Sequence, residues 1–186
     1  FYVCYYIGWF LKSHVFPDQF SDTSDVVIGG EIHSWKEAQL RVKQALKDSW
    51  RSDERYGWGY DEYHPISRKG KNTGAKPLGW IIVDSLDTMI IMDLQDEYKR
   101  AENWVNNELR YDSNTDVNVF ETTIRMLGGL LSAHYMTEND MYLEKATQLA
   151  NRLIGGFDTP TGIPYSTVNL KRSKGKASAV DNGAAS

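Results

Sequence analysis

Glu121 and Arg125 have the residue types and the spacing that point most directly to acid–base chemistry. They lie in the stretch 116–135, DVNVFETTIRMLGGLLSAHY, which predicts an amphipathic helix from about Phe120 to Tyr135. Because the two residues are four apart, their side chains share one helix face. One interpretation is a plain ion pair, worth roughly 0.2–0.5 kcal/mol. The other is a carboxyl group held in a cavity with its pKa set by its surroundings, as glycoside hydrolysis requires.

The same predicted helix carries an apolar and a polar stripe side by side. The apolar stripe consists of Ile124, Leu127, Leu131 and Tyr135. The polar stripe consists of Glu121, Arg125, Gly128 and Ser132, and Met126 and Leu130 lie on the far side. This pattern is typical of an inner helix in a double ring, with apolar flanks against neighbours and a polar strip toward a central cavity. A mid-helix glycine costs about 1 kcal/mol relative to alanine, so Gly128-Gly129 predicts close approach of another backbone or a ligand.

Two aspartates raise a similar question in the apolar segment WIIVDSLDTMIIM, residues 80–92. Asp84 and Asp87 are three apart and share a helix face with Thr88 and Ile91. A buried carboxylate without a partner is costly, so each needs either a function or a structural partner. We interpret Asp87 as structural, satisfied by loop amides or an arginine. For Asp84 both interpretations stay open.

The elements that position these side chains are predicted to be helices joined by long loops. Ser34 and Glu37 have the spacing of a capping box and start a helix that runs to about Tyr56. Further helices are predicted at residues 80–92, 96–111, 120–135 and 140–154, and long loops at residues 57–80 and 158–183. No convincing pair of strands is apparent. The predicted fold class is therefore all-α, built from antiparallel helical hairpins.

Composition excludes several classes of function. The chain has 186 residues, 41% hydrophobic and 25% charged, which is ordinary for a globular protein. Its net charge of −4 argues against nucleic acid as a partner, which would require a basic face. The four histidines show no metal-ligand spacing. Because the chain begins at Phe1 and stops at Ser186 inside DNGAAS, we expect it to be a fragment.

The N-terminal residues divide into two segments ahead of the main domain. FYVCYYIGWFL has no charge but is too short to span a bilayer, which takes about 20 apolar residues. We interpret residues 1–16 as the end of a membrane anchor, with a buried segment or a signal-peptide remnant as the alternatives. Residues 17–33 form a linker, and residues 34–186 form the main domain.

Four motifs follow one another with plausible gaps, and together they resemble a known family. They are GWGYDEYHPISR, KPLGWIIVDSLDTMIIM, DVNVFETTIRMLGGLLSAHYM and TGIPYSTVNL. The chain from about Trp35 to Ser186 resembles the class I α-1,2-mannosidases, glycoside hydrolase family forty-seven, and among them the fungal endoplasmic-reticulum processing type. The resemblance implies part of an (α/α)7 barrel, with only the first few helical hairpins present. It also implies inverting, calcium-dependent hydrolysis of α-1,2-linked mannose from Asn-linked high-mannose glycans.

The resemblance implies roles for three residues. Glu121 matches the family's catalytic acid, which acts on the leaving oxygen through a water. Arg125 matches an arginine that lines the sugar subsite, and Asp84 matches an acidic, substrate-side residue in the barrel core. The family's base candidates and its calcium-binding threonine are expected beyond Ser186, so no metal ligand is expected within this chain. We therefore expect the segment alone to be inactive and marginally stable, with apolar faces exposed.

The resemblance also implies a place in the cell and a competing function. Family members of this type are usually type II membrane proteins of the endoplasmic reticulum or early Golgi, anchored at the N-terminus with a lumenal catalytic part. The alternative is a quality-control relative that binds high-mannose glycans without efficient hydrolysis. A helical scaffold is a third hypothesis, with no positive feature beyond the hairpins.

Overall fold

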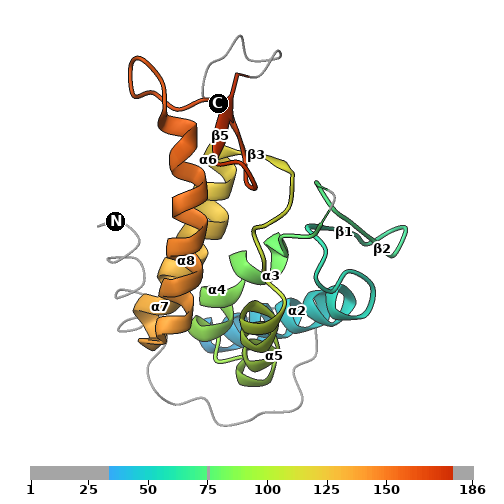
Figure 1. The fold of residues 1–186 in the computed structure, drawn as a ribbon. Coiled ribbons are helices and arrows are strands. Elements are labelled where there is room, and N and C mark those ends of the chain that lie inside the picture. The colour runs from blue at the N-terminus through green and yellow to red at the C-terminus, as the bar shows by residue number, and fades with distance from the viewer. Residues whose placement is uncertain (1–33, 75, 178–186) are drawn as a thin grey trace.

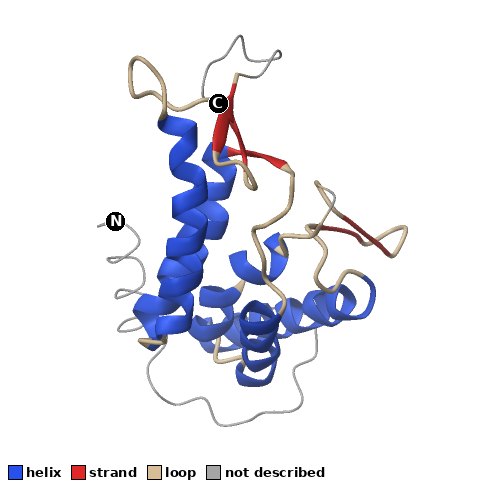
Figure 2. Cartoon of the chain, viewed as in Figure 1, coloured by secondary structure: helices blue, strands red, loops and turns tan. Residues whose placement is uncertain are grey.

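A computed structural model describes residues 34–74 and 76–177, so the expected anchor (1–16) and linker (17–33) lie outside the described residues. Five of its helices are longer than five residues and classed as α-helices: α2 (Trp35–Tyr56), α4 (Leu86–Ile91), α5 (Gln95–Asn107), α7 (Gly128–Thr137) and α8 (Asp140–Leu153). Shorter helical pieces are α3 (Trp80–Asp84), α6 (Val119–Glu121), the π-helical η2 (Thr122–Leu127) and the 3₁₀ turn η3 (Ile154–Phe157). The chain is mostly helical, as predicted (Figure 2).

Local sequence signals account for several helix ends. The Ser34 hydroxyl accepts a hydrogen bond from the Glu37 amide at 3.1 Å, which confirms the predicted N-cap of α2. Asn139 caps α8 in the same way, accepting from the amide of Met141 at 3.0 Å. The apolar segment 80–92 is helical but divided at Ser85 into α3 and α4.

The helices pack in two groups that share one core (Figure 1). The continuous rod α6–η2–α7 lies along α8, and α7 also contacts α3 and α4. On the other side α5 packs against α3 and α4. Fully buried side chains from these helices form the core: Ile82, Val83, Leu86, Met89, Ala101, Val105, Met126, Leu130, Tyr142 and Leu149.

Short strands are present, so the prediction of no strand pairs is wrong. β1 (Glu62–His64) pairs with β2 (Lys69–Lys71) as an antiparallel hairpin. β3 (Asp116–Asn118), β4 (Thr167–Asn169) and β5 (Lys174–Lys176) form an antiparallel sheet in that order. Each strand has only three residues, which is too short for an alternating pattern to identify, and β2 and β5 both read Lys-Gly-Lys.

The predicted burial of the Glu121 helix needs a second correction. Leu127 and Leu131 of the apolar stripe are partly buried against the core, but Ile124 and Tyr135, which were expected to pack likewise, are 52% and 64% exposed. Met126, Leu130 and Ala133 are the buried residues of the rod. Within the described residues, the apolar stripe is therefore covered only in part.

No helix in the described part of the chain combines the length and the apolar character that crossing a membrane requires.

Candidate active site

Glu121 is positioned by a strand that turns directly into a helix. β3 ends at Asn118, whose side chain caps the following α6 by accepting a hydrogen bond from the Glu121 amide at 2.8 Å. Glu121 therefore lies in the first turn of the rod, where the positive end of the helix dipole favours a negative charge. Its side chain is 37% exposed, which leaves it half-buried rather than surrounded by solvent.

Arg125 pairs with Glu121 across one turn. Its Nε lies 2.7 Å from Oε2 of Glu121, so the ion pair anticipated from the spacing is present. That Oε2 atom is buried and accepts no hydrogen bond of good geometry within the described part of the chain. The pair lies at the start of the π-helical turn η2, where one extra residue per turn changes the side-chain directions. Such π-helical turns occur frequently at functional sites.

Trp80 brings α3 into the same site. The guanidinium carbon of Arg125 lies 5.5 Å from the centre of the Trp80 ring, a cation–π distance. The sequence analysis missed Trp80, because an aromatic residue at the start of an apolar helix is usually a core residue. Only its place four residues before Asp84 connects it with the candidate site.

Asp84 shares the electrostatic environment of this pair. Its side chain is exposed, yet neighbouring protein atoms displace enough water to raise the pKa of its carboxyl group. The positive charge of Arg125 opposes this rise, and the negative charges of Asp87 and Glu121 add to it. The structure therefore brings together all three predicted site residues, Glu121, Arg125 and Asp84. A carboxyl group with a raised pKa beside an arginine is suited to acid–base chemistry or to hydrogen bonding with a sugar hydroxyl.

Asp87 has a structural partner on the neighbouring helix. Ser132 of α7 donates its hydroxyl to Oδ2 of Asp87 at 2.8 Å. Thr88 contributes a longer contact to Oδ1 at 3.4 Å. The structural interpretation of Asp87 agrees with this geometry, although the partners are hydroxyl groups rather than the expected amides or arginine. The bond ties α4 to α7 beside the site.

The two mid-helix glycines differ in what surrounds them. A Cβ at Gly129 would lie 2.8 Å from the Val83 carbonyl oxygen, so α3 approaches the rod too closely for any side chain. A Cβ at Gly128 would meet only the Thr123 carbonyl oxygen, at 3.5 Å. The predicted close backbone approach is therefore confirmed at Gly129 alone, and it brings Asp84 and Trp80 of α3 toward η2.

Asp61 anchors the loop that leads into α3. It is 4% exposed, and its Oδ1 accepts hydrogen bonds from the amides of Leu78 at 2.6 Å and Gly79 at 3.0 Å. Its Oδ2 accepts from the amide and the hydroxyl of Thr73 at 2.9 and 2.8 Å. These four bonds tie Asp61 to Thr73, Leu78 and Gly79 and set the start of α3, so Asp61 supports the site without belonging to it. The sequence did not predict this anchor.

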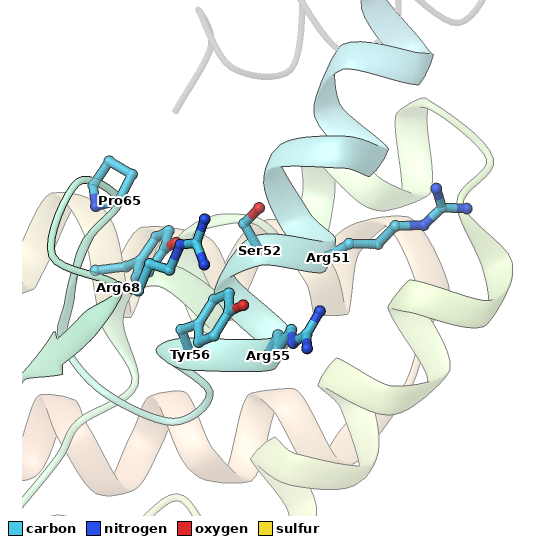
Figure 3. A pocket seen from close by; sticks show the side chains of 7 residues that line it. Arg51, Ser52, Arg55, Tyr56, Pro65 and Arg68 are labelled. Carbon is cyan, nitrogen blue, oxygen red and sulfur yellow. The ribbon is translucent and has the colours of Figure 1, made fainter.

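Two surface pockets are described elsewhere on the molecule. One of about 430 Å³ lies between α2 and the β1–β2 hairpin, and Figure 3 shows the side chains of Arg55 and Arg68 beside Tyr56 there. The other, about 520 Å³, lies along the β3–β4–β5 sheet and includes Asp116 and Lys176. Neither pocket contains Glu121. The sugar-sized hollow expected around Glu121 therefore stays a prediction.

The described residues do not supply a metal centre. No group of three or more His, Cys, Asp or Glu side chains in residues 34–74 and 76–177 is arranged to hold a metal ion. Calcium takes about six to eight oxygen ligands. The carboxylates near Arg125 therefore do not fit a calcium site by themselves, and none of the chemistry derived from these residues passes through a metal.

The structure thus places a half-buried glutamate, paired with an arginine, at the start of a helix in a mostly helical protein. The sequence model of glycosyl hydrolase family 47 matches residues 45–186. The chain belongs to this family.

Individual relatives agree with the family. A mannosyl-oligosaccharide 1,2-α-mannosidase of Candida albicans is 60% identical over 152 residues, 82% of this chain and 27% of the relative. An endoplasmic reticulum mannosyl-oligosaccharide 1,2-α-mannosidase of Schizosaccharomyces pombe is 48% identical over 136 residues, 73% of this chain and 26% of the relative. The solved structure of an α-1,2-mannosidase from Trichoderma reesei superposes with a TM-score of 0.68 at 29% identity, covering 76% of this chain and 32% of that one. The chain spans about a quarter of the length of the curated relatives it matches.

Proposed function

We propose that this chain is the N-terminal part of the catalytic domain of an α-1,2-mannosidase that trims Asn-linked high-mannose glycans. The observation that carries the proposal is the Glu121–Arg125 pair, half-buried at the start of a helix, in a chain that is 60% identical to a mannosyl-oligosaccharide 1,2-α-mannosidase. Family membership supports the substrate class, and the half-buried pair supports Glu121 as the acid.

In this proposal each site residue has a separate task. In its protonated form Glu121 passes a proton to an intervening water, which in turn protonates the leaving sugar oxygen, and Glu121 is left as a carboxylate. Arg125 keeps the Glu121 carboxyl group in place and offers its remaining N–H groups to the sugar. Asp84, with its raised pKa, accepts or donates a hydrogen bond at the rim of the same site.

Inversion requires a second carboxylate on the opposite side of the sugar. The two carboxyl groups of an inverting glycosidase lie roughly 6.5–9.5 Å apart, which leaves room for the attacking water. We assign that base, and the ligands of the calcium ion on which the family generally depends, to residues beyond Ser186. The chain alone is then expected to be inactive.

The partly exposed apolar stripe on the Glu121 rod supports a partial (α/α)7 barrel. Ile124 and Tyr135 of this stripe are more than half exposed. Further helices of the same domain would cover these residues and complete the enclosure of the polar strip. In the same proposal, residues 1–16 end a membrane anchor, residues 17–33 are a linker, and the catalytic part is lumenal, in the endoplasmic reticulum or early Golgi.

The decisive experiment is an assay of the complete protein on a high-mannose glycan, with mannose release measured beside glycan binding. Hydrolysis that is lost in Glu121→Gln while binding is retained would support the mannosidase. Binding without hydrolysis in the wild-type protein would instead establish the quality-control relative. Neither binding nor hydrolysis would refute both and leave the helical scaffold.

A further inference from the structure

We infer that Trp80 is a positioning residue for the reaction, because it holds the guanidinium of Arg125 in the orientation in which it pairs with Glu121. The inference rests on the proposed function, since it concerns how the proposed acid is kept in place. In this inference Trp80 acts on the reaction through Arg125, whose guanidinium carbon lies 5.5 Å from the centre of its ring.

The Arg125–Glu121 ion pair is too weak by itself to keep the Arg125 side chain in one orientation. It is an i,i+4 pair whose side chains are 47% and 37% exposed. Pairs of this kind contribute little, because water screens the charges and long side chains lose rotamer freedom when they are fixed. The buried Oε2 of Glu121 accepts no well-directed hydrogen bond among the described residues. No such bond therefore adds to the ion pair at this oxygen.

Trp80 contributes an aromatic surface to this pair from another helix, α3. Its ring centre lies 5.5 Å from the guanidinium carbon of Arg125. An indole is the strongest of the aromatic partners for a cation, and the planar guanidinium is the side chain best shaped to stack on it. A ring face at this distance limits the positions open to the guanidinium, while its Nε stays on Glu121.

The Trp80 side chain is itself held in place by its surroundings. It is half-buried and packs against the hydrophobic core, as the first residue of α3. The preceding Gly79 has a φ of +64°, and a Cβ there would overlap the Trp104 ring. Oδ1 of Asp61 accepts a hydrogen bond from the Gly79 amide at 3.0 Å. The start of α3 is thus fixed from two sides.

The charges around Arg125 show why its orientation matters. Arg125 pairs with Glu121 at 2.7 Å, and its positive charge also acts on the carboxyl group of Asp84. In this inference, an Arg125 side chain without the ring beside it would divide its time between the two carboxyl groups. The Trp80 ring is the contact that selects one of these arrangements.

The test is a double-mutant cycle in the complete protein. Trp80→Leu is expected to lower kcat by about threefold to tenfold with little change in KM, which is the range that loss of a cation–π contact gives. Trp80→Phe keeps a ring face and is expected to recover most of the activity. In an Arg125→Ala background, Trp80→Leu should have no further effect, because the residue through which it acts is already gone.

Three results would overturn the inference. They are wild-type activity in Trp80→Leu, losses that multiply in the double mutant, and a loss in Trp80→Leu that Trp80→Phe does not rescue. Trp35→Leu, at a tryptophan that is 89% exposed, is the matched control and should leave activity unchanged. If Trp80→Leu does not fold, Trp80→Phe carries the cycle, with about a twofold loss when Arg125 is present and none in the Arg125→Ala background.

Glu121→Gln separates this inference from the proposed function. Full activity of Glu121→Gln would remove the proposed function itself. An inactive Glu121→Gln together with an unaffected Trp80→Leu would keep the mannosidase and reject only the role of Trp80.

Discussion

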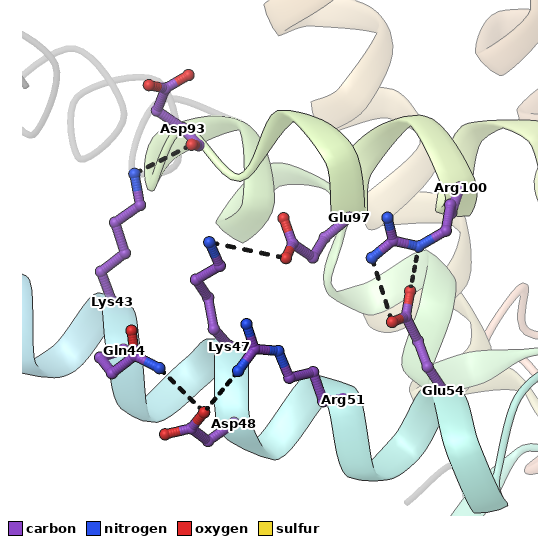
Figure 4. Close-up of polar contacts among 9 residues, drawn as sticks. All are labelled: Lys43, Gln44, Lys47, Asp48, Arg51, Glu54, Asp93, Glu97 and Arg100. Carbon is purple, nitrogen blue, oxygen red and sulfur yellow. Dashed lines mark hydrogen bonds and ion pairs between the residues drawn. The ribbon is translucent and has the colours of Figure 1, made fainter. Parts of the chain in front are cut away.

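Two arginine–glutamate pairs of almost the same length lie in different surroundings. Arg100 of α5 holds Glu54 of α2 with two hydrogen bonds, of 2.6 and 3.2 Å, and Figure 4 shows this pair bridging the two helices. Arg125 holds Glu121 within one helix at 2.7 Å. The first pair has the better geometry, with a forked guanidinium on both carboxylate oxygens.

The difference lies in what surrounds each pair. Near this pair, Lys47 of α2 lies 4.0 Å from the buried Glu97 of α5, and Lys43 donates to the carbonyl of Asp93, which precedes α5, at 3.1 Å (Figure 4). Arg125 instead has an aromatic ring beside it, a π-helical turn beneath it and a second carboxyl group with a raised pKa nearby. A short ion pair alone therefore does not indicate an active site. The groups that surround the pair are the better indication.

Replacing the two arginines in the complete protein tests this contrast most strongly. Arg125→Ala is expected to reduce mannose release by about 100-fold, the scale of losing one preorganised electrostatic group in an active site. Arg100→Ala should leave activity near wild type. Equal losses in the two variants, measured as kcat/KM on a high-mannose glycan, would contradict the contrast.

A buried aspartate in the α2 region gives the next largest effect, on stability rather than activity. Asp53 is 4% exposed, neither carboxylate oxygen has a hydrogen-bond partner among the described residues, and burial, with a smaller contribution from Glu54, raises its pKa to about 6. The folded state binds the Asp53 proton more tightly than the unfolded state does. The resulting contribution to the free energy of unfolding is therefore complete below about pH 4 and is lost as the pH rises through about 6. The loss is about 3 kcal/mol by pH 7.

Denaturant unfolding of wild type and Asp53→Asn across about pH 4–7 measures that loss. The difference in unfolding free energy between the two should grow through this window, with the variant gaining on the wild type. Parallel curves would show that Asp53 does not titrate in the folded protein.

The two glycines of the Glu121 rod offer a smaller, matched comparison. Gly129→Ala forces a methyl group against the Val83 carbonyl and should destabilise by about 1–3 kcal/mol, as overpacking does. Gly128→Ala meets no such contact and should stabilise by up to about 1 kcal/mol through helix propensity. Thermal unfolding distinguishes them, and similar changes at both positions would mean that α3 does not press on the rod at Gly129.

The smallest expected effect is the coupling between Glu54 and Arg100. At a half-exposed site a double-mutant cycle should give about 0.2–1 kcal/mol and weaken with added salt. A coupling several times larger and insensitive to salt would show that good geometry outweighs solvent screening here.

Much of the helical framework and the central pair could be predicted because the signals are local. The Ser34 cap depends on residues three positions apart, and the Glu121–Arg125 pair on residues four apart. The buried side of the rod was assigned wrongly in part, because exposure of Ile124 depends on which helices pack beside it. Short strands such as β2 escaped prediction because three polar residues carry no pattern.

The sequence by itself determined the helices, their caps, the family and the place of Glu121 beside Arg125, since each follows from neighbours within a few residues or from motifs that persist as strings. Only the tertiary structure decided that Trp80 lies beside Arg125, that Ser132 bonds Asp87, and that Gly129 rather than Gly128 admits α3. These contacts join residues about 45 positions apart, and no local pattern records which helix faces meet once the chain packs its core.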